Sequence, residues 1–415
     1  MRKSFYVSND AVIYETRNNR LATPANFSPQ FDAHAVAEPG FRIYIIEMTE
    51  DAVTTVNSWQ VSYTFLAGHE YRVIIARDPE VSGEIANFEE FVNAIRIKYE
   101  SESYYIPSWY KTYIVSKVET INTTSKNSCN GDSFVFFTDY HTLSNAENSH
   151  DLISYILKHT GIRFAVFGGD ILNEPDTKED AYNELVRFYK NFYDINPYYV
   201  IGNHEYNNPA MEDSRVPIEL NQKELYGILC KRKECAYVSR DSVNICDYAF
   251  DNTLQKIRYV VLCCWKNATI IDSQIWWFAD ILKDTPNGYK LVVLSHIGLS
   301  QQGSILTDMN VVPDILDALK QQQSFTWSGS TWDFTAKSID VIGVFSGHNH
   351  SDYIARTNAN IPIISTTTDA KGQALVQRYT RNELEQAFDV VNIDITNRKI
   401  YMTRVGYGKD REISY

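Results

Sequence analysis

The sequence is poor in the features that mark unusual protein classes. None of its apolar runs reaches the roughly 18 residues that a membrane-spanning helix needs, which excludes a transmembrane helix. Six cysteines in 415 residues are too few for a disulfide framework, so we expect free thiols. The spacing of Cys230 and Cys235 matches no standard zinc motif. With few Gly and Pro and no internal repeat, the composition is that of an ordinary globular protein.

Positive charge is also scarce. The chain carries 39 Lys and Arg against 52 Asp and Glu, a net charge of −13 at pH 7. Nonspecific binding to nucleic acid or to an anionic membrane depends on basic patches, so the charge argues against both partners. A protein this acidic that handles phosphate must neutralise it locally, which metal ions do well.

The amino terminus lacks a complete signal sequence. Met1 to Phe5 is similar to a basic leader, but the polar residues Ser8, Asn9 and Asp10 interrupt the place of the apolar stretch. We therefore expect the protein to be cytoplasmic as synthesised.

The length predicts two domains, because single cores rarely grow beyond about 250–300 residues. In residues 1–106, apolar and polar residues alternate along 41–48, 58–65 and 71–76, which predicts an all-β sandwich. This layout resembles the small jelly-roll modules appended to hydrolases of gut bacteria and their phages. The resemblance implies attachment to a glycan or contacts in particle assembly, with association to a virion; a structural cap or an oligomerisation module fits equally well.

Residues 107–131 are interpreted as a connecting segment. Tyr110, Ile114, Val118 and Ile121 lie on one face of a predicted helix. The polar stretch 122–128 then predicts a linker, and we place the domain boundary there.

Residues 132–415 predict a second domain of the α/β class. Apolar strands are expected at 134–137, 164–167 and 198–201, with helices around 152–157 and 182–193 between them. Further strands are expected at 259–262, 291–294, 341–345, 391–395 and 400–404. Strands that are apolar on both faces and alternate with helices predict a sheet covered by helices.

Side chains able to bind metals directly follow five of these strands. They are Asp139 and His141, Asp170, Asn203 and His204, His296, and His348 and His350. In open α/β sheets ligands bind at the carboxyl ends of the strands, so we expect these side chains to converge. Imidazole, carboxylate and amide oxygen together suit divalent ions such as Zn, Fe, Mn or Ni. Taken singly, each residue has a structural interpretation: Asp139 and Asp170 as helix caps, His296 as a buried core histidine.

The order of these blocks resembles the calcineurin-like metallophosphoesterases. That family has Asp-x-His, Gly-Asp, Gly-Asn-His-Glu/Asp, a single His and Gly-His-x-His, and all five blocks occur here in order between residues 139 and 350. The resemblance implies a four-layer αββα core with two central sheets and a centre of two divalent ions.

The resemblance also implies a role for each residue. Asp139, His141 and His350 would bind the first ion, and Asn203, His296 and His348 the second. Asp170 would bridge the two ions, and His204 would act as the general acid. A metal-bridging hydroxide would attack the phosphorus of a phosphomonoester or phosphodiester in line.

One residue departs from the best-known branch of the family. Protein phosphatases carry Gly-Asp-x-x-Asp-Arg-Gly, in which the second Asp orients the catalytic His, whereas this chain has Asn173 at that position. Asn173 can hydrogen-bond to an imidazole but supplies no charge, so its support of His204 is in question. The Arg and Gly are missing too, which argues against a phosphoprotein phosphatase.

The remaining candidates receive structural interpretations. His34, His69, His150 and His159 are expected at the surface or on helices, and Trp276, Trp277 and Phe278 in the core. Asp410 and Arg411 are expected in a solvated terminal segment. A competing hypothesis for the whole chain is a glycan-binding or phage-tail-like assembly protein with a vestigial metallo-domain; the intact ligand set argues against it.

Overall fold

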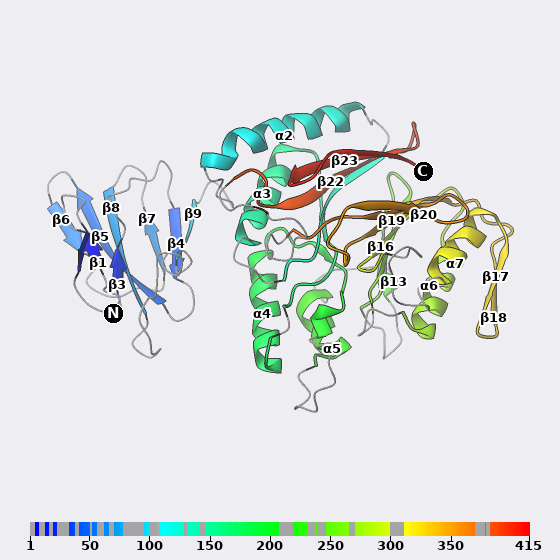
Figure 1. Cartoon of the computed structure of the whole chain (residues 1–415), viewed down its shortest axis with the longest axis horizontal. Coiled ribbons are helices and arrows are strands. Elements are labelled where there is room, and N and C mark those ends of the chain that lie inside the picture. Colours follow the sequence, from blue (N-terminus) through cyan, green and yellow to red (C-terminus); the bar gives the residue numbers. More distant parts are fainter. Residues whose placement is uncertain are drawn as a thin grey trace. The chain divides into compact units, whose positions relative to one another are not determined.

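The structure, a computed structural model, divides the chain into two compact units, Met1–Tyr105 and Ile106–Tyr415 (Figure 1). It describes residues 5–7, 13–15, 20–22, 33–37, 41–49, 52–55, 62–65, 70–77, 95–99, 106, 108–127, 131–141, 146–173, 175–206, 219–230, 237–238, 246–264, 270–298, 311–369, 378 and 382–415.

The described residues of the first unit form strands. One sheet has the order β3-β8-β5-β6 and another β7-β4-β9, and β1 pairs with β2. Their bounds are β1 (Phe5–Val7), β2 (Ile13–Glu15), β3 (Arg20–Ala22), β4 (Ala33–Ala37), β5 (Phe41–Thr49), β6 (Ala52–Thr55), β7 (Ser62–Phe65), β8 (Glu70–Arg77) and β9 (Ile95–Tyr99). Ile43, Ile45, Val73 and Ile75 are buried, as the alternation predicts. The jelly-roll arrangement stays a prediction, and residues 58–61 and His69 lie outside the described residues.

Helix α2 (Ser108–Asn127) opens the second unit and runs along β22 and β23 (Figure 1). The linker predicted at 122–128 is wrong up to Asn127, because the helix continues through it. The helix accommodates these polar residues: the hydroxyls of Thr123 and Thr124 donate to the backbone carbonyls four residues earlier, at 2.8 and 3.0 Å. Ser125 accepts a bond from Asn392, which ties the end of α2 to the sheet.

A six-stranded sheet has the order β12-β11-β10-β22-β23-β24. The first three strands are parallel to one another, and the last three form antiparallel pairs. The strands are β10 (Gly131–Phe137), β11 (Ala165–Phe167), β12 (Tyr198–Tyr199), β22 (Ala387–Asp394), β23 (Lys399–Gly406) and β24 (Arg411–Ser414). Helices α3 (Ala146–His159) and α4 (Lys178–Asn191) connect the parallel strands.

A seven-stranded sheet has the order β13-β14-β15-β16-β19-β21-β20. Its strands are β13 (Tyr237–Val238), β14 (Tyr248–Asn252), β15 (Ile257–Leu262), β16 (Lys290–Ser295), β19 (Asp340–Ser346), β20 (Tyr353–Arg356) and β21 (Pro362–Ser365). Helices α6 (Asp272–Asp284) and α7 (Val311–Lys320) and the hairpin β17 (Ser324–Trp327) and β18 (Ser330–Asp333) follow its strands. Between the sheets in sequence lie the short helices η1 (His204–Tyr206), α5 (Gln222–Leu225) and η2 (Tyr226–Cys230).

The two sheets pack against each other through aromatic side chains. Phe134 of β10 lies 5.4 Å from Phe345 of β19 and 5.9 Å from Tyr259 of β15, between ring centroids. On β15, Tyr259 joins this shared core, while Val260 packs with α6 and α7 on the other face. Because the central strands are covered on both faces, they are apolar over 134–137, 165–167 and 291–294, as the sequence predicts. The mixed α/β class expected for residues 132–415 is therefore confirmed.

Some predictions for single residues are confirmed and others are wrong. Cys230, Cys246, Cys263 and Cys264 are free and buried, whereas Cys129 and Cys235 lie outside the described residues. Phe278 is buried as expected, but Trp276 is exposed. Arg411 does not lie in a solvated tail: it belongs to β24 and its guanidinium pairs with the buried Asp389. Among the described helices, none combines the length and apolarity needed to cross a membrane.

His150 was expected at the surface or on a helix; it lies on α3 but is buried between two carboxylates. Its Nδ1 contacts Asp151 at 2.8 Å and its Nε2 contacts Asp194 at 2.9 Å. Burial lowers the pKa of His150, but the hydrogen bonds to Asp151 and Asp194 outweigh it and raise the pKa above the usual value.

We expect this histidine to make stability pH-dependent. Because the folded-state pKa is raised, the protonated form of His150 stabilises the fold. This contribution to the unfolding free energy is complete below about pH 6.5, the usual histidine pKa, and is lost as pH rises through the folded-state pKa. His150→Gln should therefore flatten the fall in unfolding free energy between pH 6 and pH 9, measured by urea denaturation. His159→Gln, at an exposed position on the same helix, is the control. An unchanged pH profile in the His150 variant would contradict the assignment.

Candidate metal centre

The eight predicted residues follow the carboxyl ends of five strands drawn from both sheets. Strands β10, β11 and β12 of the six-stranded sheet precede Asp139 and His141, Asp170, and Asn203 and His204. Strands β16 and β19 of the seven-stranded sheet precede His296, and His348 and His350. Within each set the strands run parallel, so their carboxyl ends share one edge.

Six of these side chains form two groups with convergent ligand atoms. Asp139, His141 and His350 make one group; Asp170, His296 and His348 make the other. In each group one ligand atom per residue lies within 4.8 Å of the others. The structure therefore brings together side chains from distant parts of the chain, as the strand ends predict.

In the first group a backbone carbonyl orients the ring of His141. His141 Nδ1 lies 3.1 Å from the carbonyl of Leu172 and donates to it, which leaves Nε2 with its lone pair facing inward. This Nε2 lies 3.1 Å from Nε2 of His350, which is 3.3 Å from Asp139 Oδ1. The Asp139 carboxylate is held in place by hydrogen bonds from Thr138 Oγ1 (2.7 Å) and from the His348 backbone N–H (3.1 Å).

The second group places two electron-pair donors face to face. His296 Nδ1 donates to the Gly168 carbonyl at 2.8 Å, so Nε2 carries the lone pair of the neutral ring. That Nε2 lies 2.9 Å from Asp170 Oδ2, a contact that either a proton on the ring or a bound metal ion makes favourable. Burial lowers the pKa of His296, but the Asp170 carboxylate outweighs this and raises it to about 10. A proton on His296 thus takes the position that suits a metal ion, and the Nδ1 contact is typical of metal-binding histidines.

Asp170 acts electrostatically on both groups. Burial alone would raise its pKa, but His296 lowers it well below its usual range. In the first group, burial lowers the pKa of His141, and the Asp170 charge is the largest effect that opposes it. A carboxylate whose charge raises the pKa values of histidines in both groups fits a position shared by two cations.

Asn203 and His204 lie beside these groups. The side-chain oxygen of Asn203 is buried and accepts no hydrogen bond in the structure, as expected of an atom reserved for a metal ion. The His204 backbone N–H donates to Asp170 Oδ1 at 2.9 Å, and His204 Nε2 lies 3.9 Å from Asp170 Oδ2. The His204 ring is partly exposed and lies 4.9 Å from the His141 ring.

The backbone of the centre is strained. Five residues have positive φ, a region that side chains other than glycine rarely adopt. They are Asp139 (55°), His141 (47°), Asp170 (63°), His348 (70°) and His350 (50°). Such strain persists only where surrounding contacts enforce it, and it concentrates at functional sites.

Two glycines permit the close approach of the ligand loops. A Cβ on Gly202 would lie 2.2 Å from Asp170 Oδ1, and a Cβ on Gly347 would lie 2.3 Å from Asp139 Oδ2. Any side chain at either position would displace a carboxylate of the centre.

Glu205 was in the recognised motif but received no role from the sequence. It is fully buried and accepts hydrogen bonds from the backbone N–H groups of Asp170 (3.0 Å), Ile171 and Gly202. Burial, reinforced by the nearby Asp170 charge, raises the pKa of Glu205 to about 7. Glu205 thus joins the loop of Asp170 to the loop of Asn203. Asn173 is exposed, and its support of His204 stays a prediction.

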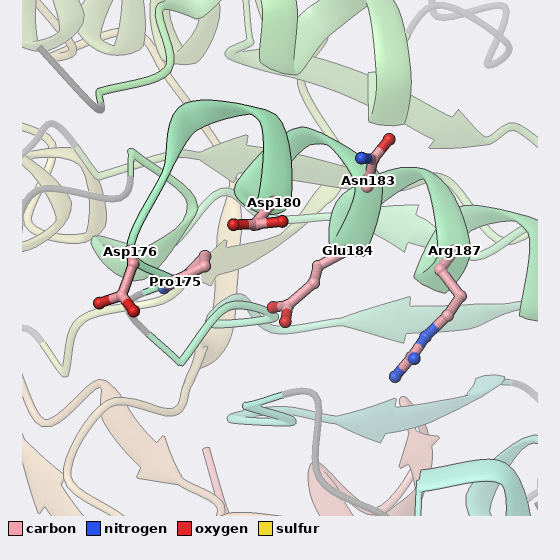
Figure 2. A pocket seen from close by; sticks show the side chains of 6 residues that line it. All are labelled: Pro175, Asp176, Asp180, Asn183, Glu184 and Arg187. Atoms are coloured by element: carbon pink, nitrogen blue, oxygen red, sulfur yellow. The ribbon is translucent and has the colours of Figure 1, made fainter. Parts of the chain in front are cut away.

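A surface pocket of about 340 Å³ lies outside the centre, at the start of α4 (Figure 2). Its lining residues are Pro175, Asp176, Asp180, Asn183, Glu184 and Arg187. Helix capping explains part of its acidity: Thr177 accepts from the Asp180 backbone N–H at 3.1 Å, and carboxylates in a first turn complement the helix dipole. The pocket shares no lining residue with the centre.

Comparison with known proteins identifies the family of the chain. The calcineurin-like phosphoesterase family model matches residues 133–352. A dimetal phosphatase from Danio rerio is similar over 68% of this chain and 99% of its own, with 12% identity and a TM-score of 0.50, a likeness of fold. Vacuolar protein sorting 29 from Cryptosporidium parvum is aligned over 69% of this chain and 99% of its own, at 10% identity and a TM-score of 0.29. No significant match was found among curated proteins.

The family match spans more than half of the chain and includes every residue of both ligand groups. The chain belongs to the calcineurin-like phosphoesterases.

Proposed function

We propose that the protein is a binuclear metal-dependent hydrolase of phosphomonoesters or phosphodiesters. The observation that carries the proposal is the convergence of two groups of ligand atoms, in each of which one atom per residue lies within 4.8 Å of the others. When bound, two divalent ions would supply an activated water for in-line attack and neutralise the phosphoryl oxygens.

The proposed ligand sets follow the two groups. Asp139, His141 and His350 would hold one ion, and Asn203, His296 and His348 the other, with Asp170 shared. Mn, Fe, Zn and Ni all suit these oxygen and imidazole donors.

His204 is proposed as the general acid. Its backbone N–H bond to Asp170 fixes the residue at the edge of both groups, and its partly exposed ring can reach a leaving group. A protonated imidazole there would donate a proton to the departing alkoxide.

The proposed architecture is a four-layer αββα core over residues 132–415, with residues 1–106 as a separate accessory domain. The order of helices, six-stranded sheet, seven-stranded sheet and helices supports the first part. The competing hypothesis, a glycan-binding or assembly protein with a vestigial centre, is not favoured, since both ligand groups are intact and the family match covers them.

Hydrolysis of generic substrates tests the proposal. The purified protein, supplied with Mn²⁺, Zn²⁺, Fe²⁺ or Ni²⁺ in turn, should hydrolyse an aryl phosphate or a bis-aryl phosphate and lose this activity to a chelator. His204→Ala should lower kcat by about 10²- to 10⁴-fold, because general acid catalysis contributes that much, while metal content stays unchanged. His159→Ala, at an exposed helical position, is the matched control. Turnover that survives complete metal removal would refute the proposal, as would full activity in the His204 variant.

A further inference from the structure

Four consecutive hydroxyl residues begin at the last residue of β21 and lie in the interior of the molecule. Ser365, Thr366, Thr367 and Thr368, here called the hydroxyl segment, are at most 6% exposed. Buried hydroxyls must find hydrogen-bond partners, and the partners of these four identify what the segment does.

Three of the hydroxyls donate to backbone carbonyls in the loops of the metal centre. Thr368 Oγ1 donates to the carbonyl of Asp139 at 2.6 Å, and Thr367 Oγ1 donates to the carbonyl of His350 at 2.8 Å. Ser365 Oγ reaches the carbonyl of Gly347 at 3.3 Å. The two shortest of these bonds therefore join two residues of the same ligand group.

The targets are strained residues. Asp139 and His350 have φ angles of 55° and 50°, which would relax without contacts that hold the adjoining carbonyls. Adjacent to Thr368, the Asp369 backbone N–H donates to the carbonyl of Thr138 at 2.9 Å, so the segment holds the Asp139 loop at two successive carbonyls.

Charged side chains, of which Asp389 and Arg404 are buried, fix the hydroxyl segment in turn. The Thr367 backbone N–H donates to Asp352 Oδ1 at 3.0 Å, and Thr366 Oγ1 donates to Asp389 Oδ2 at 2.7 Å. Arg404 lies between these carboxylates and donates to both oxygens of each, at 2.7 to 3.0 Å. The segment is thereby anchored to β22 and β23 of the opposite sheet.

The second ligand group has different supports. Glu205 binds the backbone of Asp170 and Gly202, and the Gly168 carbonyl orients His296. Ser365 reaches only the residue before His348. The hydroxyl segment and Glu205 therefore support different groups directly. The two groups also touch, because the His348 backbone N–H donates to Asp139 and the His141 backbone N–H donates to the Asp170 carbonyl, both at 3.1 Å.

We propose that Thr367 and Thr368 are positioning residues that set the metal affinity of the group formed by Asp139, His141 and His350, with a larger effect on this group than on the other. This inference rests on the proposed binuclear centre. Contacts that orient metal ligands are worth about 10- to 100-fold in affinity, and the two hydroxyls act on ligands of one ion only.

Metal titration of near-isosteric variants tests the proposal. Thr367→Val and Thr368→Val should each weaken the binding of one Mn²⁺ by about 10- to 100-fold in calorimetry and weaken the binding of the other ion much less. At limiting Mn²⁺, electron paramagnetic resonance should show an uncoupled ion, as in His350→Ala. Thr367→Ser keeps the hydroxyl and should retain both affinities. Thr326→Val, at an exposed threonine whose hydroxyl bonds to Thr331, is the control.

The outcomes separate this inference from the proposed function. Unchanged affinity in both valine variants, or equal weakening of both ions, would overturn the inference while leaving a two-ion wild-type enzyme intact. A wild-type chain that binds fewer than two ions would overturn the proposed binuclear centre and this inference with it. Circular dichroism of the metal-free variants checks that the fold persists; weakening that Thr367→Ser fails to rescue would also count against the proposal.

Discussion

Asp170→Asn is expected to lower kcat/KM on an aryl phosphate by about 10³-fold or more, the loss typical of removing a principal electrostatic contribution at a reaction centre. The charge of Asp170 interacts with histidines of both ligand groups, and its Oδ2 lies 2.9 Å from His296 Nε2. Asparagine preserves the shape but removes the negative charge that two neighbouring cations would share. We therefore expect metal content to fall from two ions per chain together with activity.

The control for this prediction is Asp176→Asn. Asp176 is an exposed carboxylate further along the same loop and lines the pocket at the start of α4 (Figure 2). It should keep both activity and metal content, measured by steady-state kinetics and by inductively coupled plasma mass spectrometry. Two bound ions and wild-type kcat/KM in Asp170→Asn would show that Asp170 is not shared between them, and would remove the basis of the proposed mechanism.

The strand ends of the centre were predictable because a strand buried on both faces is a continuous apolar run in the sequence. Phe134 to Phe137 is apolar at every position, since β10 is covered on both faces, and the polar residues that follow mark where the strand reaches the edge. Short motifs with fixed spacing then identified which polar residues converge. Both signals are local, so one sequence was enough to bring Asp139 and His350 into one hypothesis.

The supports of the centre could not be predicted in the same way. Thr366, Thr367 and Thr368 have the composition of an ordinary strand end or loop, and their partners lie 17 to 229 positions away in the sequence. No periodicity encodes which carbonyl a hydroxyl meets across two sheets. The helical continuation of α2 was missed for a related reason: its threonines satisfy their hydroxyls within the helix, so a polar composition resembled a linker.

Arg411 was misjudged because charge usually indicates exposure, and for the same reason the burial of Arg404 and Asp389 was not predicted. Arg404 and Asp389 are 1% and 0% exposed, and each satisfies the other. A buried pair of this kind has no local signature, since its cost is offset only by partners that the fold brings together. It is nevertheless the anchor of the hydroxyl segment, so its energetics bear directly on the centre.

Arg404→Met is expected to lower the unfolding free energy of the second unit by about 3–5 kcal/mol, the typical effect of removing one partner of a buried ion pair. Methionine fills much of the space but removes the guanidinium that makes four hydrogen bonds to Asp389 and Asp352. Both carboxylates then depend on Arg411 for a neighbouring positive charge. Urea denaturation followed by tryptophan fluorescence measures the change. Arg398→Met is the control: Arg398 pairs with Asp340 at the surface, where an ion pair contributes below about 1 kcal/mol.

The pH dependence of the variant identifies the cause. Burial by itself would raise the pKa of Asp389, but Arg404 and Arg411 hold it below its usual range. In the wild type, Asp389 therefore contributes stability above its unfolded pKa of about 3.9, and this is lost as pH falls through the lower folded-state pKa. Without Arg404 the folded-state pKa must rise, so Asp389 can take up a proton in the folded variant as the solution is acidified.

The destabilisation by Arg404→Met should consequently shrink as pH is lowered from 7 toward 4, and adding Asp389→Asn should recover part of it at pH 7. A defect that is constant with pH and untouched by the second substitution would mean that lost packing, not an unpaired charge, is responsible. In that case the hydroxyl segment would be anchored by the shape of the arginine side chain. If the charge is responsible, metal binding by the group of Asp139 and His350 should weaken in Arg404→Met and recover in the double variant along with stability.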